Sequence, residues 1–280
     1  NLYDEPFSDS SQIPTFLVSK LAQEQVTVSL SGDAGDEVFC GYNRYKIRAN
    51  LWDKLAAVPL PFRKLVAMGL TSISPKSWNK LAGGLAGLTS LFSQFSNVGD
   101  KLHKGAGVLA SRSSDALYLG LVSNWYDPES VVIGGCEPPT LLTGNLPALN
   151  RLEGVQRMMA LDMLTYLPDD ILTKVDRAAM GVSLETRLPF LDHRVVEFAW
   201  SLPQTMKLRD GQTKWALRQV LYRHVPKALI ERPKMGFGVP IENWLRGPLR
   251  EWTESLLCET RLRQEGYFHP ALIRQKWAEH

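Results

Sequence analysis

The feature that most constrains the fold is a short apolar run that leads directly into an acidic, glycine-bearing turn. Val26–Leu30 (VTVSL) holds three β-branched residues and predicts a buried strand. The next residues, Ser31–Glu37 (SGDAGDE), are followed by a helical pattern that continues to about Leu55. A strand, a glycine-bearing loop and a helix in this order form half of a βαβ unit. Because a single strand must pair, we expect its sheet partners to lie before Asn1 or in another chain.

Most of the remaining chain has helical periodicity. The pattern predicts helices over residues 13–25, 152–167, 171–180, 192–201, 211–224 and 240–258. Prolines 59 and 61 and the segment 72–76 interrupt the pattern, and residues 105–150 are rich in glycine and proline. The sequence therefore predicts a predominantly helical α/β fragment.

Composition excludes several classes of protein. The 280 residues include 32 Lys and Arg and 29 Asp and Glu, and a net charge of +3 is too small to indicate nucleic-acid binding. No apolar run approaches the roughly 18 residues that a membrane span needs. Cys40, Cys136 and Cys258 are far apart and form no CxxC pair, which favours a reducing compartment. We expect a cytoplasmic protein that binds neither nucleic acid nor membranes.

The acidic turn has two explanations. Asp33, Asp36 and Glu37 crowd three carboxylates into five residues, and beside a phosphate this charge would need a cation such as Mg²⁺ bridging to pyrophosphate. Alternatively, Asp36 and Glu37 only complement the dipole of a helix start. No GK dipeptide occurs, so the turn is not a Walker A loop.

Two further segments carry charged residues that are candidates for a functional role. Asp170, Lys174 and Arg177 fall at positions i, i+4 and i+7 of one helical face. They form either an ordinary surface ion pair of Asp170 with Lys174, or a partnered group on an otherwise apolar helix. Lys234 lies in a loop with two glycines, where it is either an exposed cation or a neutraliser of phosphate charge.

A resemblance follows from five sequence blocks taken together. They are DEPFSDSS, LSGDAGDEVFCGYNRY, YLPDDILTKVDRAAM, SLETRLPFLDHRVVEFAWSLP and RPKMGFGVPIENWLRGPLR. In this order, and over nearly the whole chain, they resemble the synthetase domain of glutamine-hydrolysing asparagine synthetases. Such proteins join an N-terminal glutaminase domain to a synthetase domain of the PP-loop ATP pyrophosphatase type. The resemblance implies that aspartate, ATP and ammonia from glutamine are substrates, that Mg²⁺ is the cofactor, and that β-aspartyl-AMP is the intermediate. It leaves a homodimer open.

The resemblance also implies roles for residues of the acidic turn. Ser31 and Gly32 match the pair that binds the nucleotide after the strand. Asp33 matches an acidic residue that is important for forming the acyl-adenylate. Asp36 matches the carboxylate associated with Mg²⁺ and pyrophosphate, and Glu37 lies beside it.

Further candidates lie later in the chain. Lys234 matches the lysine that stabilises charge on the α-phosphate and pyrophosphate. Asp170, Lys174, Asp176 and Arg177 belong to a matching block that lines the cleft.

The chain departs from the family pattern in two ways. Asp33 stands where glutamate is usual, which points to a subfamily with a different acceptor. The pyrophosphate-binding loop SGGxDS, the glutaminase domain with its cysteine and the C-terminal tail are all absent. We therefore expect residues 1–280 to be a partial synthetase domain, with most of its parallel sheet missing, that is inactive alone.

Two alternatives remain. A related amidotransferase would use another carboxylate acceptor, as would a β-lactam-forming relative. A non-catalytic helical scaffold would use the acidic turn only as a helix cap.

Overall fold

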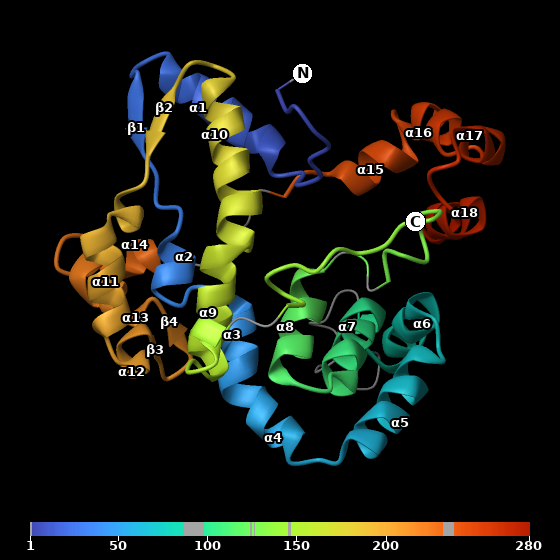
Figure 1. Cartoon of the computed structure of the whole chain (residues 1–280), viewed down its shortest axis with the longest axis horizontal. Helices are drawn as coiled ribbons and strands as arrows, with labels where there is room; N and C mark the ends of the chain where they lie inside the picture. Colours follow the sequence, from blue (N-terminus) through green and yellow to red (C-terminus); the bar gives the residue numbers. More distant parts are fainter. Residues whose placement is uncertain (1, 87–97, 124, 126, 145–146, 232–237) are drawn as a thin grey trace. The chain divides into compact units, whose positions relative to one another are not determined.

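A computed structural model of the chain describes residues 2–86, 98–123, 125, 127–144, 147–231 and 238–280. The chain divides into two compact units. Unit 1 comprises residues 1–41, 125–148 and 159–280, and unit 2 comprises residues 42–124 and 149–158. The division falls within helix α9 (Gly154–Leu164) and within the 3₁₀ turn Pro147–Leu149. Both units are mostly helical (Figure 1), as the sequence predicts.

Unit 1 holds all the strands among the described residues. Its elements are α1 (Gln12–Gln23), β1 (Val28–Leu30), α2 (Gly35–Val38), the π-helical segment Leu167–Leu172, α10 (Thr173–Met180), β2 (Glu185–Arg187), the 3₁₀ turn Pro189–Leu191, α11 (His193–Ser201), α12 (Gln204–Lys207), β3 (Leu208–Arg209), β4 (Gln212–Thr213), α13 (Trp215–Leu221), α14 (Lys227–Ile230), α15 (Ile241–Arg246), α16 (Arg250–Leu256), α17 (Glu259–Glu265) and α18 (Pro270–Glu279).

The predicted strand forms, but its partner lies within the chain. β1 pairs in parallel with β2, with Ser29 opposite Thr186 (Figure 1). The expectation that every partner lies before Asn1 or in another chain is therefore wrong. The strand is also not buried among the described residues, because Val28 is 43% and Leu30 75% exposed. The distance in sequence between the two short strands concealed the pairing.

A small apolar core fixes α2 against α11. Val38, Phe39 and Ala199 are buried together. The partly buried residues packed against them are Met163, Phe190, Val195, Val196, Leu202 and Leu217. Gly35 opens α2 close to the Phe190 ring, and a Cβ added there would lie 3.1 Å from a ring carbon. Glycine at this position therefore lets the start of α2 approach the core.

Unit 2 consists of helices joined by short loops, with no strand among its described residues. Its elements are α3 (Asn43–Ile47), the π-helical segment Arg48–Trp52, α4 (Asp53–Ala56), α5 (Leu60–Thr71), α6 (Pro75–Ala86), α7 (Val98–Ala110) and α8 (Ser114–Val122). Helices α5 and α6 both pack against α7. The buried Arg63 side chain donates hydrogen bonds to the carbonyl oxygens of Leu109 and Ser111, which lie at and just after the end of α7.

Two predicted helices are interrupted. The helix expected up to Leu55 stops after Val38 and resumes at Asn43, because Cys40 takes a left-handed backbone conformation. The helix expected over residues 240–258 breaks at Gly247 into α15 and α16. Within the described part of the chain, every helix is too short or too polar to cross a bilayer.

Candidate functional site

The acidic turn, residues Ser31–Glu37, directly follows β1 at its carboxyl end. The Ser31 amide donates to the carbonyl oxygen of Arg187 over 2.8 Å, which extends the β1–β2 pairing to the first residue of the turn. The Ser31 hydroxyl donates to a carboxylate oxygen of Asp33, and the Asp33 amide donates to the Ser31 hydroxyl. The structure therefore joins Ser31 and Asp33 within the turn, and their roles stay predictions.

Gly32 lies between these two residues with open space around it. It is exposed, and a Cβ added to Gly32 would meet no described atom within 4 Å. Its φ angle lies outside the left-handed region that favours glycine. Neither its backbone conformation nor its described neighbours require glycine, so Gly32 leaves room for a ligand at the backbone.

Asp36 is held by a lysine that sequence reasoning missed. Its Oδ2 lies 3.0 Å from the Nζ of Lys214, and the Gly41 amide donates to the Asp36 carbonyl oxygen over 2.7 Å. A Cβ added to Gly41 would lie 1.8 Å from Asp36 Oδ1 and 2.4 Å from Lys214 Cε. The Asp36 side chain therefore lies over Gly41, in a place that only glycine leaves open.

The backbone around Asp36 is strained. Ala34 (φ +68°), Cys40 (φ +60°) and Lys214 (φ +53°) are all non-glycine residues in the left-handed region. Each such residue costs about 1–2 kcal/mol, and strain of this kind clusters at functional sites. The strain supports a functional rather than a purely structural turn.

The three carboxylates of the turn do not converge on one point. Glu37 is 1% exposed, whereas Asp33 and Asp36 are partly exposed. Among the residues that the structure describes, no three His, Cys, Asp or Glu side chains lie close enough together to hold a metal ion. The described residues of the turn therefore form no three-ligand cluster, and Mg²⁺ at Asp36 stays a prediction. Asp33 and Asp36 still fit Mg²⁺, which is commonly bound by one or two carboxylates together with substrate phosphates.

A second polar group joins α10 to the N-terminal loop. Lys174 is 9% exposed, and its Nζ donates to Asp9 Oδ2 over 2.6 Å. Arg177 pairs with Asp4 at 3.0 Å, on the exposed side of the helix. The interpretation of an ordinary surface pair of Asp170 with Lys174 is therefore wrong, because Lys174 is buried and binds Asp9.

The surroundings of Lys174 shift the pKa values of Asp9 and Asp170 in opposite directions. Burial would raise the pKa of Asp9, but hydrogen bonds from Lys174 and Ser11 outweigh it and hold the pKa below its usual range. Burial, and next the Asp9 charge, raise the pKa of Asp170, although Lys174 opposes them. The lysine therefore stabilises one carboxylate of the pair much more than the other.

The other predicted residues differ in their surroundings. Asp176 is exposed on α10, whereas Lys174 and Val175 just before it are buried. Lys234 lies outside the described residues. The contacts of Lys174 and Arg177 tie them to the N-terminal loop, so their predicted place in a cleft stays a prediction.

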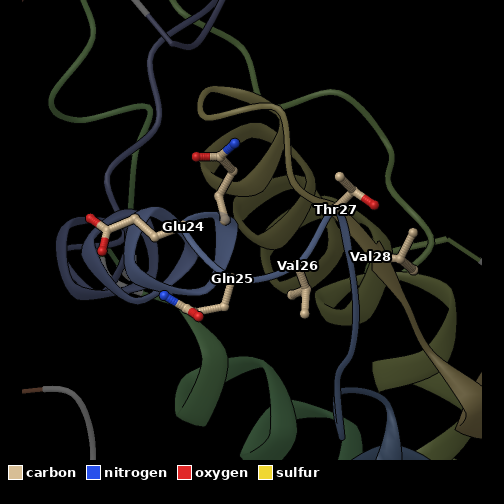
Figure 2. A pocket seen from close by; sticks show the side chains of 6 residues that line it. Glu24, Gln25, Val26, Thr27 and Val28 are labelled. Carbon is tan, nitrogen blue, oxygen red and sulfur yellow. The ribbon is translucent and has the colours of Figure 1, made fainter.

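A shallow hollow lies at the other end of β1. It is lined by residues 23–28, before and at the start of the strand. The side chains of Glu24, Val26 and Thr27 point in different directions (Figure 2). The acidic turn follows the opposite end of this strand, so the hollow does not belong to it.

Gly41 and Gly32 form a matched pair for testing this geometry. In the full-length protein, Gly41→Ala is expected to lower stability by about 1–3 kcal/mol, because the methyl group overlaps Asp36 and Lys214. Gly32→Ala meets no described atom and is expected to change stability by less than about 0.5 kcal/mol. Thermal unfolding midpoints of both variants measure the difference, and equal midpoints would contradict the described position of Asp36.

Asp9 and Asp170 are expected to respond oppositely to neutralisation. At pH 7, Asp9→Asn should destabilise the protein by about 1–3 kcal/mol, because it leaves the buried Lys174 without its partner. Asp170→Asn should stabilise it, because the native state carries this carboxylate at a cost.

The pH dependence of stability is the control for these two variants. The depressed pKa of Asp9 contributes stability above its unfolded value of 3.8 that is lost as the pH falls through the folded value. The raised pKa of Asp170 gives a cost that is absent below 3.8 and grows as the pH rises. The unfolding midpoint of Asp170→Asn should therefore converge on that of the wild type as the pH falls from 7 to 4, whereas the deficit of Asp9→Asn should persist until the pH falls below 3.8. Shifts of the same sign at pH 7 would contradict the account.

Comparison with known proteins supports the resemblance to asparagine synthetases. A family model described as asparagine synthase matches residues 1–280. Asparagine synthetase (glutamine-hydrolyzing) 1 of Bacillus subtilis is 28% identical over 278 residues, covering 99% of this chain and 40% of the relative. A putative asparagine synthetase (glutamine-hydrolyzing) of Mycobacterium bovis is 36% identical over 257 residues, covering 89% of this chain and 35% of the relative.

A more distant relative, amidase chyE of Penicillium rubens, is 22% identical over 271 residues, covering 90% of this chain and 38% of the relative. No solved structure gave a significant match. The chain spans about two fifths of the length of the curated relatives it matches. Because the family model covers every residue, the chain belongs to the asparagine synthase family.

Proposed function

We propose that the full-length protein containing this chain is an ATP-dependent ligase that converts aspartate to asparagine. The observation that carries the proposal is the acidic turn at the carboxyl end of β1, where parallel strands present ligand sites. Membership of the asparagine synthase family supports the reaction class. The chain itself would be a partial synthetase domain of the PP-loop ATP pyrophosphatase type, with the glutaminase domain, the SGGxDS loop and the C-terminal tail supplied elsewhere in the protein.

The reaction has two steps. A β-carboxylate oxygen of aspartate attacks the α-phosphorus of ATP, the bond to the β-phosphate oxygen breaks, and pyrophosphate leaves. Ammonia from glutamine then attacks the carbonyl carbon of β-aspartyl-AMP, the bond to the AMP oxygen breaks, and a proton is lost. The products are asparagine, AMP and pyrophosphate.

Residues of the turn have distinct tasks in this scheme. The open backbone at Gly32 and the Ser31 hydroxyl would bind nucleotide phosphate. Asp33 would act where the acyl-adenylate forms, and Asp36 would hold Mg²⁺, which supplies charge neutralisation for the pyrophosphate when bound. Lys214 keeps the Asp36 carboxylate in place, since its Nζ lies 3.0 Å from Oδ2.

Lys234 and the α10 group complete the proposal. Lys234 would stabilise charge on the α-phosphate and the leaving pyrophosphate. Asp170, Lys174 and Arg177 would line the cleft from α10 and the π-helical segment before it, and the ion pair of Lys174 with Asp9 supports an ordered wall there.

A second candidate keeps the chemistry and changes the acceptor. Asp33 is one methylene shorter than the glutamate usual at this position, and its carboxylate is drawn toward Ser31 by a hydrogen bond. Both features would leave more room for the acceptor, which favours a larger carboxylate than aspartate. A panel of carboxylic acids, scored by acceptor-dependent pyrophosphate release, discriminates the two candidates.

Replacing Asp36 tests the proposal in the full-length protein. With ATP, Mg²⁺, aspartate and ammonia, Asp36→Asn should lower kcat for pyrophosphate release by about 10²–10³-fold, because a charge that acts in the transition state is lost. The unfolding midpoint should change little, since a partly exposed ion pair is worth only about 0–1 kcal/mol.

The control is Asp210→Asn, which removes a carboxylate whose side chain is 94% exposed, and it should leave kcat unchanged. The 280-residue chain alone should release no pyrophosphate. A fully active Asp36→Asn protein, or an inactive wild type with every acceptor, would overturn the proposed function.

A further inference from the structure

Lys214 is the cation that the structure places against Asp36. Its Nζ lies 3.0 Å from Asp36 Oδ2, and the two side chains are only 29% and 23% exposed. Its Cε lies over Gly41, where an added Cβ would be 2.4 Å away. Partial burial strengthens electrostatic interactions relative to bulk water, so the charge of Lys214 acts on any ion that approaches Asp36.

The backbone of Lys214 is fixed from both sides. Before it, Thr213 is buried and pairs with Leu208 in the β3–β4 hairpin. After it, the Arg218 amide donates to the Lys214 carbonyl oxygen over 2.9 Å, and Arg218 Nε donates to the Thr213 carbonyl oxygen over 3.0 Å. The Arg218 guanidinium also pairs with Glu231. These contacts hold Lys214 in its left-handed conformation, so its place beside the turn does not depend on Asp36 alone.

A fixed ammonium beside a metal-binding carboxylate acts in opposite directions on two ligands. Free Mg²⁺ carries the same sign of charge as Lys214 and competes with it for Asp36, so the lysine disfavours the metal alone. The magnesium complex of ATP keeps a net negative charge, so the lysine attracts it. An ammonium has several N–H donors, and Lys214 can therefore bind a phosphate oxygen while it contacts Asp36.

We infer that Lys214 makes the acidic turn selective for the magnesium–polyphosphate complex over free Mg²⁺, an inference that rests on the proposed function. The lysine keeps Asp36 paired until the nucleotide arrives with its metal. It then offsets the negative charge of the phosphates beside Asp33 and Asp36. Lys214 is therefore a specificity-determining residue as well as a support for the Asp36 carboxylate.

The test measures two affinities of the full-length protein. Electron paramagnetic resonance gives the affinity for Mn²⁺ alone, as a substitute for Mg²⁺, and calorimetry gives the affinity for a non-hydrolysable ATP analogue with Mg²⁺. Lys214→Met should strengthen Mn²⁺ binding and weaken analogue binding, each on the order of tenfold. Mn²⁺ bound at the turn is the part that a further Asp36→Asn change removes.

Two further variants are the controls. Lys214→Arg keeps the positive charge and should retain the wild-type pattern of both affinities. Lys276→Met removes a lysine from an exposed ion pair with Glu279 on α18, and it should change neither affinity.

Opposite changes in the two affinities identify the role of Lys214, because loss of a purely structural support for Asp36 weakens both together. A Lys214→Met protein that has both affinities weakened or both unchanged, or that fails to fold, would overturn the inference. So would a Lys214→Arg protein that behaves like Lys214→Met. In each case the proposed function survives if the wild type releases pyrophosphate with aspartate. A wild-type protein that binds no analogue and releases no pyrophosphate would overturn both.

Discussion

The Asp36 carboxylate, lying over Gly41 and bound by Lys214, is the interaction on which the rest of the site depends. It joins the turn after β1 to a segment far away in the sequence. The left-handed backbone of Ala34 and Cys40, each of which costs free energy, lies on either side of it in the sequence. Burial of apolar side chains in the core formed by α2 and α11 offsets this free-energy cost.

Sequence alone predicted the local parts of the site. The strand, the turn and the start of the next helix are adjacent in the chain, and this order of elements is by itself typical of a ligand-binding sheet edge. Sequence could not predict Lys214, because nothing near this residue in the chain marks it as a partner of the turn. It also missed β2 as the partner of β1, since three-residue strands have too little periodicity to be recognised.

The charged residues of the acidic turn and those of α10 lie in different environments. Asp33 and Asp36 are partly exposed, beside an exposed glycine with open space around it, which suits a ligand that arrives from solvent. Lys174 is buried and binds Asp9, so it orders the N-terminal loop whether or not a ligand is present. The sequence pattern treated both sets as cleft residues because spacing shows which face of a helix a residue occupies, and not which segment covers that face.

Hydrogen–deuterium exchange of the full-length protein tests the central claim most directly. The account predicts that aspartate, Mg²⁺ and a non-hydrolysable ATP analogue protect the backbone amides of residues 31–37, while the peptide covering α5 exchanges as before. Unchanged exchange across residues 31–37 at saturating nucleotide, with protection confined to other segments, would show that the polyphosphate binds elsewhere.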